Sequence, residues 1–144
     1  MSTGAFVCDN TVMDFEAIHR LIKRGDSIAI RRELDDGRDP NLVNKYFWTL
    51  LMLAALVGNT KIGELLISCG ADVSKINMHG DSALSLAAGK GHLPFVKLLM
   101  DHGAKTNVRP GRRSLSYYMT ITGLSKKKRE MILDFIKGKS VESP

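Results

Sequence analysis

Residues 82–92 have the sequence SALSLAAGKGH, followed by a leucine pair at 98–99 and by DHGA at 101–104. Residues 49–59, which begin 33 positions earlier, have the sequence TLLMLAALVGN, followed by a leucine pair at 65–66 and by SCGAD at 68–72. The small first residue, the paired alanines, the glycine after them, the leucine pair and the Gly-Ala step all recur in register. A fixed period of this length indicates a chain built from structural repeats.

The repeated pattern resembles the ankyrin repeat, in which Thr-Pro-Leu-His-x-Ala-Ala, Gly-His, Leu-Leu and Gly-Ala-Asp follow one another. The resemblance implies an all-α solenoid of helix-turn-helix units. It also implies β-hairpin-like connections between the units, which are called fingers below. In function, it implies a non-catalytic module that binds other proteins as an adaptor, a scaffold or an inhibitor.

The repeat register extends to both ends of the chain, where the pattern diverges. Gly25 and Gly37 fall on Gly58 and Gly70 after the 33-residue shift, and His19 takes the consensus histidine position. Toward the C-terminus, Ser125 is expected to cap a final helix. These observations predict about four repeats, at 13–43, 44–76, 77–109 and 110–138, within one domain over 13–138. Terminal repeats diverge because one face of each is exposed to water rather than to a neighbour.

Two further expectations concern packing and the chain ends. Residues 1–12 are expected to form a flexible lead-in and residues 139–144 a frayed tail. The final helix should bury one stripe, made of Met131, Ile132, Phe135 and Ile136. The core should contain the residues at which stacked repeats pack, namely Leu51, Leu53, Ala54, Leu65, Leu66, Leu84, Leu86, Ala87, Leu98 and Leu99.

Composition narrows the class of protein. The chain has 144 residues, is 44% hydrophobic and 25% charged, and contains two cysteines, Cys8 and Cys69. No apolar run approaches the roughly 20 residues of a membrane helix, and no basic-then-apolar leader opens the chain. Two cysteines cannot form a disulfide framework and suit a reducing compartment. We therefore expect a chain that is not inserted in a membrane, is monomeric on its own, and resides in the cytoplasm or the nucleus.

The resemblance also implies where a partner would bind. In ankyrin proteins the concave binding face comes from the finger tips and from two variable positions late in each inner helix. Transferred to this chain, those positions are Lys45, Tyr46, Trp48, Leu56 and Val57 in the second repeat. In the third repeat they are Met78, His79, Asp81, Gly89 and Lys90.

The second repeat is unusual because Tyr46, Trp48, Leu56 and Val57 would place large apolar groups on the concave face. Exposed apolar patches usually mark partner sites, and Trp and Tyr are frequent hot-spot residues. The alternative is that Phe47 and Trp48 fold back over the first repeat and complete its core. Phe47 also replaces the glycine that the family has in the finger turn. A partner on this face would offer an apolar segment to Tyr46 and Trp48, and its acidic groups would meet Lys45, Lys90 and Arg112.

Positive charge is concentrated in the last quarter of the chain. Residues 1–104 carry 11 basic and 12 acidic side chains, whereas residues 105–139 carry 10 basic and 2 acidic ones. A basic patch that could bind nucleic acid or another anionic surface comprises Arg109, Arg112, Arg113, Lys126, Lys127, Lys128 and Arg129. The alternative is a solvated face that keeps the terminal repeat soluble. Nucleic-acid binding would show steep salt dependence, which groove packing would not.

Catalytic and metal-binding patterns are not found in the sequence. The histidines, His19, His79, His92 and His102, have no metal-ligand spacing. Two of them, His19 and His92, match structural positions of the ankyrin consensus. There is no glycine-rich phosphate loop, nucleophile elbow or CxxC pair. We therefore expect no enzymatic activity, no cofactor and no metal.

Overall fold

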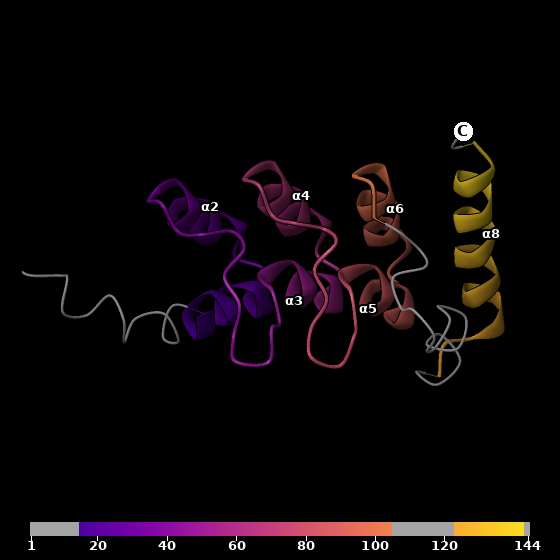
Figure 1. The fold of residues 1–144 in the computed structure, drawn as a ribbon, viewed down its shortest axis with the longest axis horizontal. Coiled ribbons are helices and arrows are strands. Elements are labelled where there is room, and N and C mark those ends of the chain that lie inside the picture. The colour runs from indigo at the N-terminus through magenta and orange to yellow at the C-terminus, as the bar shows by residue number, and fades with distance from the viewer. Residues whose placement is uncertain (1–14, 105–122, 143–144) are drawn as a thin grey trace, which may run out of the picture.

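The computed structural model of the chain describes residues 15–104 and 123–142, and these form helices in two rows (Figure 1). The inner row contains the helix at residues 15–24, α3 (Leu50–Val57) and α5 (Ala83–Lys90). The outer row contains α2 (Ser27–Asp35), α4 (Thr60–Ser68) and α6 (Leu93–Asp101), and α8 (Lys126–Glu142) follows at the far end. The described residues contain two isolated β-bridges and no sheet. The predicted all-α repeat solenoid is confirmed.

Side-chain caps fix where the inner helices begin. The Thr49 hydroxyl accepts a hydrogen bond from the Met52 amide at 3.1 Å, and the Ser82 hydroxyl accepts one from the Ser85 amide at 3.1 Å. In each case the side chain three residues into the helix accepts from the cap's own amide, which completes a reciprocal capping pair. The recurring small polar residue before each alanine pair is thus the start signal of the helix.

A glycine and a histidine connect neighbouring repeats. Gly58 ends α3 in the left-handed region at φ 81°, and a Cβ placed on it would lie 2.6 Å from Nδ1 of His92. The other ring nitrogen of His92, Nε2, lies 3.0 Å from the carbonyl oxygen of Leu56. His92 therefore links the third repeat to the end of α3, in agreement with the structural role expected for it.

The divergent first repeat folds as the register predicts. Phe15, Ile18 and Ile22 of the first helix are at most 2% exposed, and Ile30 of α2 is fully buried. Asp26 caps α2 by accepting a hydrogen bond from the Ala29 amide at 3.0 Å. The first repeat therefore has apolar residues at its core positions although it lacks the alanine pair of the second and third repeats.

The predicted core is largely confirmed. Of the ten core residues named above, only Leu86 and Leu98 remain partly exposed. Ile132 and Ile136 of α8 are buried and Phe135 is partly buried, whereas Met131 is 49% exposed. The prediction for Met131 was therefore wrong, because the face of α8 that contacts α6 is narrower than the stripe in the sequence.

The end of the last helix differs from the sequence-based prediction. The chain remains helical through Gly138 to Glu142, so a tail beginning at residue 139 was wrong. Gly138 is not among the glycines with positive φ, and a glycine that keeps helical angles weakens a helix without ending it. Residues 1–12, the finger of the predicted fourth repeat and its inner helix lie outside the described residues. Of the helices described, none is long and apolar enough to cross a membrane.

Candidate partner-binding surface

The finger of the second repeat is a tight loop organised by one asparagine. The Asn44 side-chain oxygen accepts hydrogen bonds from the amides of Tyr46 at 2.9 Å and Trp48 at 3.0 Å. The Asn44 carbonyl also accepts from the Phe47 amide at 3.0 Å, which closes a turn. Phe47 adopts φ 63° and is the one non-glycine residue with positive φ in the described chain. A residue with a Cβ is strained in this conformation.

The finger of the third repeat has the same backbone arrangement with a glycine in the strained place. The Asn77 side-chain oxygen accepts from the amides of His79 at 2.9 Å and Asp81 at 3.0 Å. The Gly80 amide donates to the Asn77 carbonyl at 2.9 Å, and Gly80 has φ 79°. Phe47 therefore replaces a turn glycine without changing the shape of the finger.

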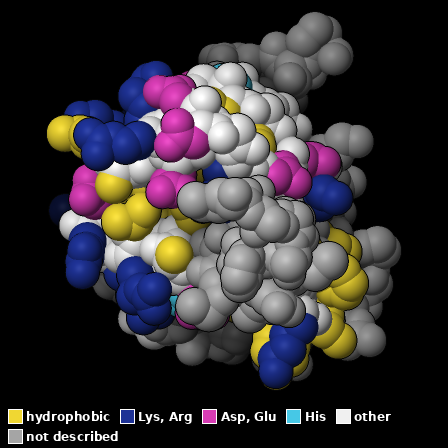
Figure 2. Space-filling view, turned by 90° about the vertical axis from the view of Figure 1, so that its left-hand side faces the viewer, with side chains coloured by type: hydrophobic (Ala, Val, Ile, Leu, Met, Phe, Trp, Pro, Cys, Tyr) yellow, Lys and Arg dark blue, Asp and Glu magenta, His cyan; other side chains and the backbone are white. Residues whose placement is uncertain are grey.

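The two fingers lie side by side and present apolar side chains to solvent. The Met78 amide donates to the Tyr46 carbonyl at 3.0 Å, which joins the fingers. Tyr46 is 47% exposed, Phe47 57%, Met78 62%, and Val57 at the end of α3 43%. Figure 2 shows hydrophobic side chains beside basic ones at the lower edge of the molecule, at the height of the fingers in Figure 1. We call Tyr46, Phe47, Val57 and Met78 the finger surface.

Trp48 and Phe47 differ in their exposure, which distinguishes the two interpretations left open by the sequence: exposure to a partner or folding back onto the core. Trp48 is only partly exposed and packs against the core, so the fold-back alternative applies to it. Phe47 projects to solvent, so that alternative was wrong for Phe47. A cavity of about 270 Å³ lies between the second finger and the first two inner helices, and Leu56 is partly buried in its wall. Its lining residues are Phe15, Glu16, His19, Asn44, Tyr46, Trp48, Leu53 and Leu56.

Cationic side chains flank the finger surface. The Lys45 ammonium lies 5.0 Å from the centre of the Tyr46 ring, and Lys90 at the end of α5 is exposed. Lys23 and Arg24 are also exposed, and the 33-residue shift puts them at the positions of Leu56 and Val57. This pair is not among the positions predicted from the sequence, although the 33-residue shift identifies it.

The remaining positions named for the concave face behave in different ways. His79 is exposed, Asp81 is partly exposed, and both have interacting partners. Gly89 is buried and offers no side chain to a partner. Arg112 lies outside the described residues.

Only the second half of the basic patch can be located. Lys126, Lys127 and Lys128 are exposed at the start of α8, with the Lys126 ammonium 3.9 Å from the Glu130 carboxylate. The Arg129 guanidinium donates to the Leu124 carbonyl at 2.9 Å, so this side chain serves the helix start. Arg109, Arg112 and Arg113 lie outside the described residues, so whether the two halves form one patch stays a prediction.

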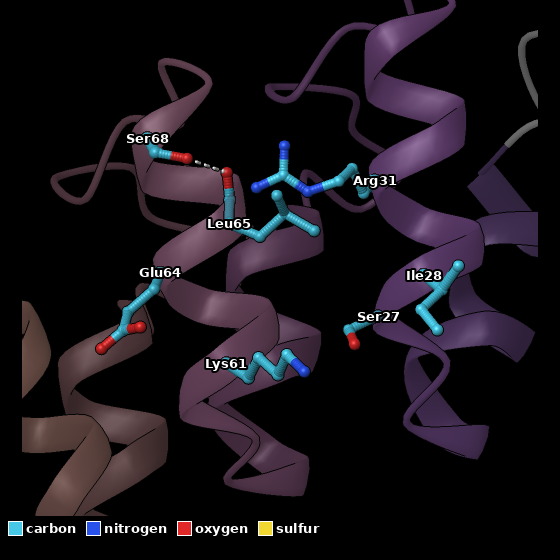
Figure 3. A pocket seen from close by; sticks show the side chains of 7 residues that line it. All are labelled: Ser27, Ile28, Arg31, Lys61, Glu64, Leu65 and Ser68. Carbon is cyan, nitrogen blue, oxygen red and sulfur yellow. Dashed lines mark hydrogen bonds between the residues drawn. The ribbon is translucent and has the colours of Figure 1, made fainter.

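A second hollow, which the sequence did not reveal, lies on the opposite side of the helical layer (Figure 3). It has a volume of about 480 Å³ and lies between α2 and α4. Its lining residues are Ser27, Ile28 and Arg31 of α2 and Lys61, Glu64, Leu65 and Ser68 of α4.

One carboxylate in a connecting loop has a perturbed acidity. The Ser74 hydroxyl donates to Oδ1 of Asp72 at 2.6 Å, and the Ser74 amide donates to the same oxygen at 2.9 Å. These hydrogen bonds favour the ionised form and lower the pKa of Asp72 below its ordinary value. In the described part of the chain, no three histidine, cysteine or acidic side chains gather in a way that could hold a metal ion.

Comparison with known proteins identifies a family. The family model described as ankyrin repeats, in three copies, matches residues 12–110, which is well over half of the chain. The chain is 40% identical over 94 residues to the ankyrin repeat and SAM domain-containing protein 6 of Rattus norvegicus, covering 64% of this chain and 11% of that protein. It is 31% identical over 86 residues to the inactive serine/threonine-protein kinase TEX14 of Bos taurus, covering 60% of this chain and 6% of that protein.

A bacterial relative shows the same limited coverage. A putative ankyrin repeat-containing protein of Treponema pallidum is 42% identical over 57 residues, which is 40% of this chain and 19% of that protein. The chain therefore spans less than a fifth of the length of each of these three relatives.

Proposed function

Because the chain belongs to the ankyrin repeat family, we propose that it binds a partner protein or peptide segment through the finger surface and the adjoining concave groove. Ankyrin repeat domains generally mediate protein–protein interactions and are generally non-catalytic. We propose in addition that the binding surface is rigid and preformed, with an apolar centre and cationic side chains at its edges. Rigidity favours binding because little conformational freedom is lost on association.

The observation that carries the proposal is the conformation and exposure of Phe47. A phenylalanine with φ 63° is strained, and a side chain 57% exposed gains little from burial in return. Strained residues of this kind cluster at functional sites. Tyr46 and Met78, which the hydrogen bond between the fingers joins, are also exposed, so the strained residue belongs to a larger apolar patch.

The charges around the patch suggest the chemistry of the partner. Lys45, Lys90 and the pair Lys23 and Arg24 are exposed, and the 33-residue period puts Lys23, Arg24 and Lys90 at positions equivalent to Leu56 and Val57. Such an arrangement favours a partner segment with an apolar anchor flanked by acidic residues, because complementary charge increases association rate and specificity. The cytoplasm or the nucleus remains the predicted location.

The test is an affinity capture with matched variants. Wild-type protein, a Tyr46→Ala, Met78→Ala double variant and a Met131→Ala control would be used as baits, and captured proteins identified by mass spectrometry. Met131 is 49% exposed and lies on α8, so its loss removes an exposed apolar side chain away from the fingers. Unchanged helical circular dichroism would first establish that all baits are folded.

We expect the same proteins to be captured by wild type and the control and to be lost with the double variant. Retention of those proteins by the double variant would contradict the finger surface as the site. Capture of nucleic acid that washes away at moderate salt would instead support the basic patch, for which the three exposed lysines of α8 are the structural basis.

A further inference from the structure

The outer helices on the two sides of α4 present different residues to their neighbours. In the next pair of outer helices, a Cβ on Gly63 of α4 would lie 2.7 Å from Cε2 of Phe95 and 3.0 Å from Cδ2 of Leu98, both on α6. Glycine therefore lets α6 pack closely against α4. The equivalent residue of α2 after the 33-residue shift is Ile30, which is fully buried. Ile30 therefore stands where the next outer helix has a glycine, and an open space lies between α2 and α4 (Figure 3).

Two cations line this space, one from each wall. Figure 3 shows the Arg31 guanidinium extending from α2 toward Leu65, and the Lys61 ammonium extending from α4 toward Ser27. Glu64 is also in the lining, but its carboxylate points to the side of α4 away from α2. Among the residues that the structure describes, neither Arg31 nor Lys61 forms an ion pair with a carboxylate. Their donors are thus available to an anion.

The rest of the hollow is apolar at its base and at one rim. Leu65 is 8% exposed beneath the opening, and Ile28 is 73% exposed at the edge. Ser68 donates its hydroxyl hydrogen to the Leu65 carbonyl at 2.8 Å, so that carbonyl already has a partner. The site therefore offers apolar contact area together with two cationic donors.

We propose that this hollow is a second binding site, on the face opposite the fingers, for an acidic segment of a partner protein. A carboxylate of that segment lies between Arg31 and Lys61, and a neighbouring apolar side chain packs on Leu65 and Ile28. Complementary charge favours an acidic segment, because the hollow offers two cations and the Glu64 carboxylate points away from it. The site uses none of the residues of the finger surface.

The experiment is an NMR titration of the ¹⁵N-labelled full chain with three short peptides. The probes are acetyl-Leu-Glu-Leu-amide, its glutamine counterpart, which has the same shape without the charge, and its phosphoserine counterpart. The glutamate peptide should shift the backbone amides of residues 27–31 and 61–65. The glutamine peptide should bind more weakly, by up to about fivefold, as expected for loss of a partly exposed ion pair.

Charge-neutralising variants place the effect at the hollow. Arg31→Gln and Lys61→Gln should each weaken the glutamate peptide roughly fivefold. Lys97→Gln removes an exposed cation from α6, at the 33-residue equivalent of Glu64, and should leave binding unchanged. All three positions are exposed, so the variants should remain folded.

Each other outcome overturns the proposal. These outcomes are the absence of shifts in residues 27–31 and 61–65 at millimolar peptide, equal binding of the glutamate and glutamine peptides, or an equal loss with Lys97→Gln. Tighter binding of the phosphoserine peptide would overturn the assignment to a carboxylate. A failed titration would not contradict the proposed finger surface, because the capture experiment depends on Tyr46 and Met78 and not on the residues of the hollow.

Discussion

The fingers of the second and third repeats have the same backbone and different tips. Each is closed by an asparagine, Asn44 or Asn77, whose side-chain oxygen accepts two backbone hydrogen bonds. Each has a residue with positive φ three positions later, Phe47 in one and Gly80 in the other. The turn geometry is therefore set by the asparagine and the repeat stacking. The tip residue must then adopt a positive φ, which costs little free energy for glycine and strains phenylalanine.

This difference separates what stabilises the fold from what is available for binding. Both fingers are stabilised in the same way, by a closing asparagine and by one isolated β-bridge. The bridge is Val43–Thr49 in the second repeat and Ile76–Ser82 in the third. Only the second finger has an aromatic tip, Phe47, and its side chain is exposed to solvent. Substitutions in the two fingers should therefore affect stability and binding independently.

The largest effect should come from removing the closing asparagine of the third finger. Asn77 is 4% exposed, so Asn77→Ala leaves two backbone amides without an acceptor and should cost roughly 2–4 kcal/mol. Asn44→Ala should cost about 1–2 kcal/mol, because Asn44 is partly exposed and water can replace its oxygen. Urea denaturation followed by circular dichroism measures both changes. Equal costs would show that burial does not distinguish the two fingers.

A smaller loss should follow from giving the third finger an aromatic tip. Gly80→Phe places a Cβ at φ 79°, and the strain of about 1–2 kcal/mol is offset in part by the reduced freedom of the unfolded chain. We expect a net loss of about 1 kcal/mol in the free energy of unfolding, measured as above. A gain in stability would mean that the stacked fingers prefer an aromatic tip for structural reasons.

The reverse substitution in the second finger should stabilise the protein. Phe47→Gly relieves the strain at φ 63° and increases the freedom of the unfolded chain, for a net gain of roughly 0.5–1 kcal/mol. Phe47→Ala keeps a Cβ at this φ and is the matched control, so it should not give this gain. A clear loss of stability with Phe47→Gly would show that the ring contributes to folding.

The smallest effect concerns the loop that leads into the third finger. The Ser74 hydroxyl and amide lower the pKa of Asp72, so ionised Asp72 stabilises the folded state above its ordinary pKa. That contribution disappears as the pH falls through the lowered pKa of the folded state. Ser74→Ala removes the stronger hydrogen bond and should raise the pKa of Asp72 toward its ordinary value, as measured by NMR titration of the carboxylate. An unchanged pKa would assign the shift to the backbone amide alone.

The sequence predicted the architecture well because repeat stacking depends on residue type at fixed spacing. Thr49 and Ser82 mark the helix starts, and the buried leucines and alanines recur at the same period. The first repeat was found through its glycines although its alanine pair is lost. The end of α8 was missed because a glycine stops a helix only when its φ becomes positive, which the sequence does not specify.

The candidate surface was predicted less completely, because exposure depends on how side chains turn. Tyr46 and Val57 are exposed as expected, while Trp48 packs against the core and Phe47 is exposed. A phenylalanine in the glycine position of a turn gave no indication of which conformation it would take. The hollow between α2 and α4 depends on the side-chain directions of Arg31, Lys61 and Glu64, which a repeat pattern does not encode.

The most direct test of the central claim is the affinity of the captured partner for wild type and for Phe47→Gly. Isothermal titration calorimetry would measure the dissociation constant, and urea denaturation of the same samples would measure stability. We expect affinity to fall about tenfold or more, as for loss of an aromatic hot-spot residue, while stability rises. An unchanged affinity together with a rise in stability would contradict the claim that the strained, exposed Phe47 is retained for binding a partner.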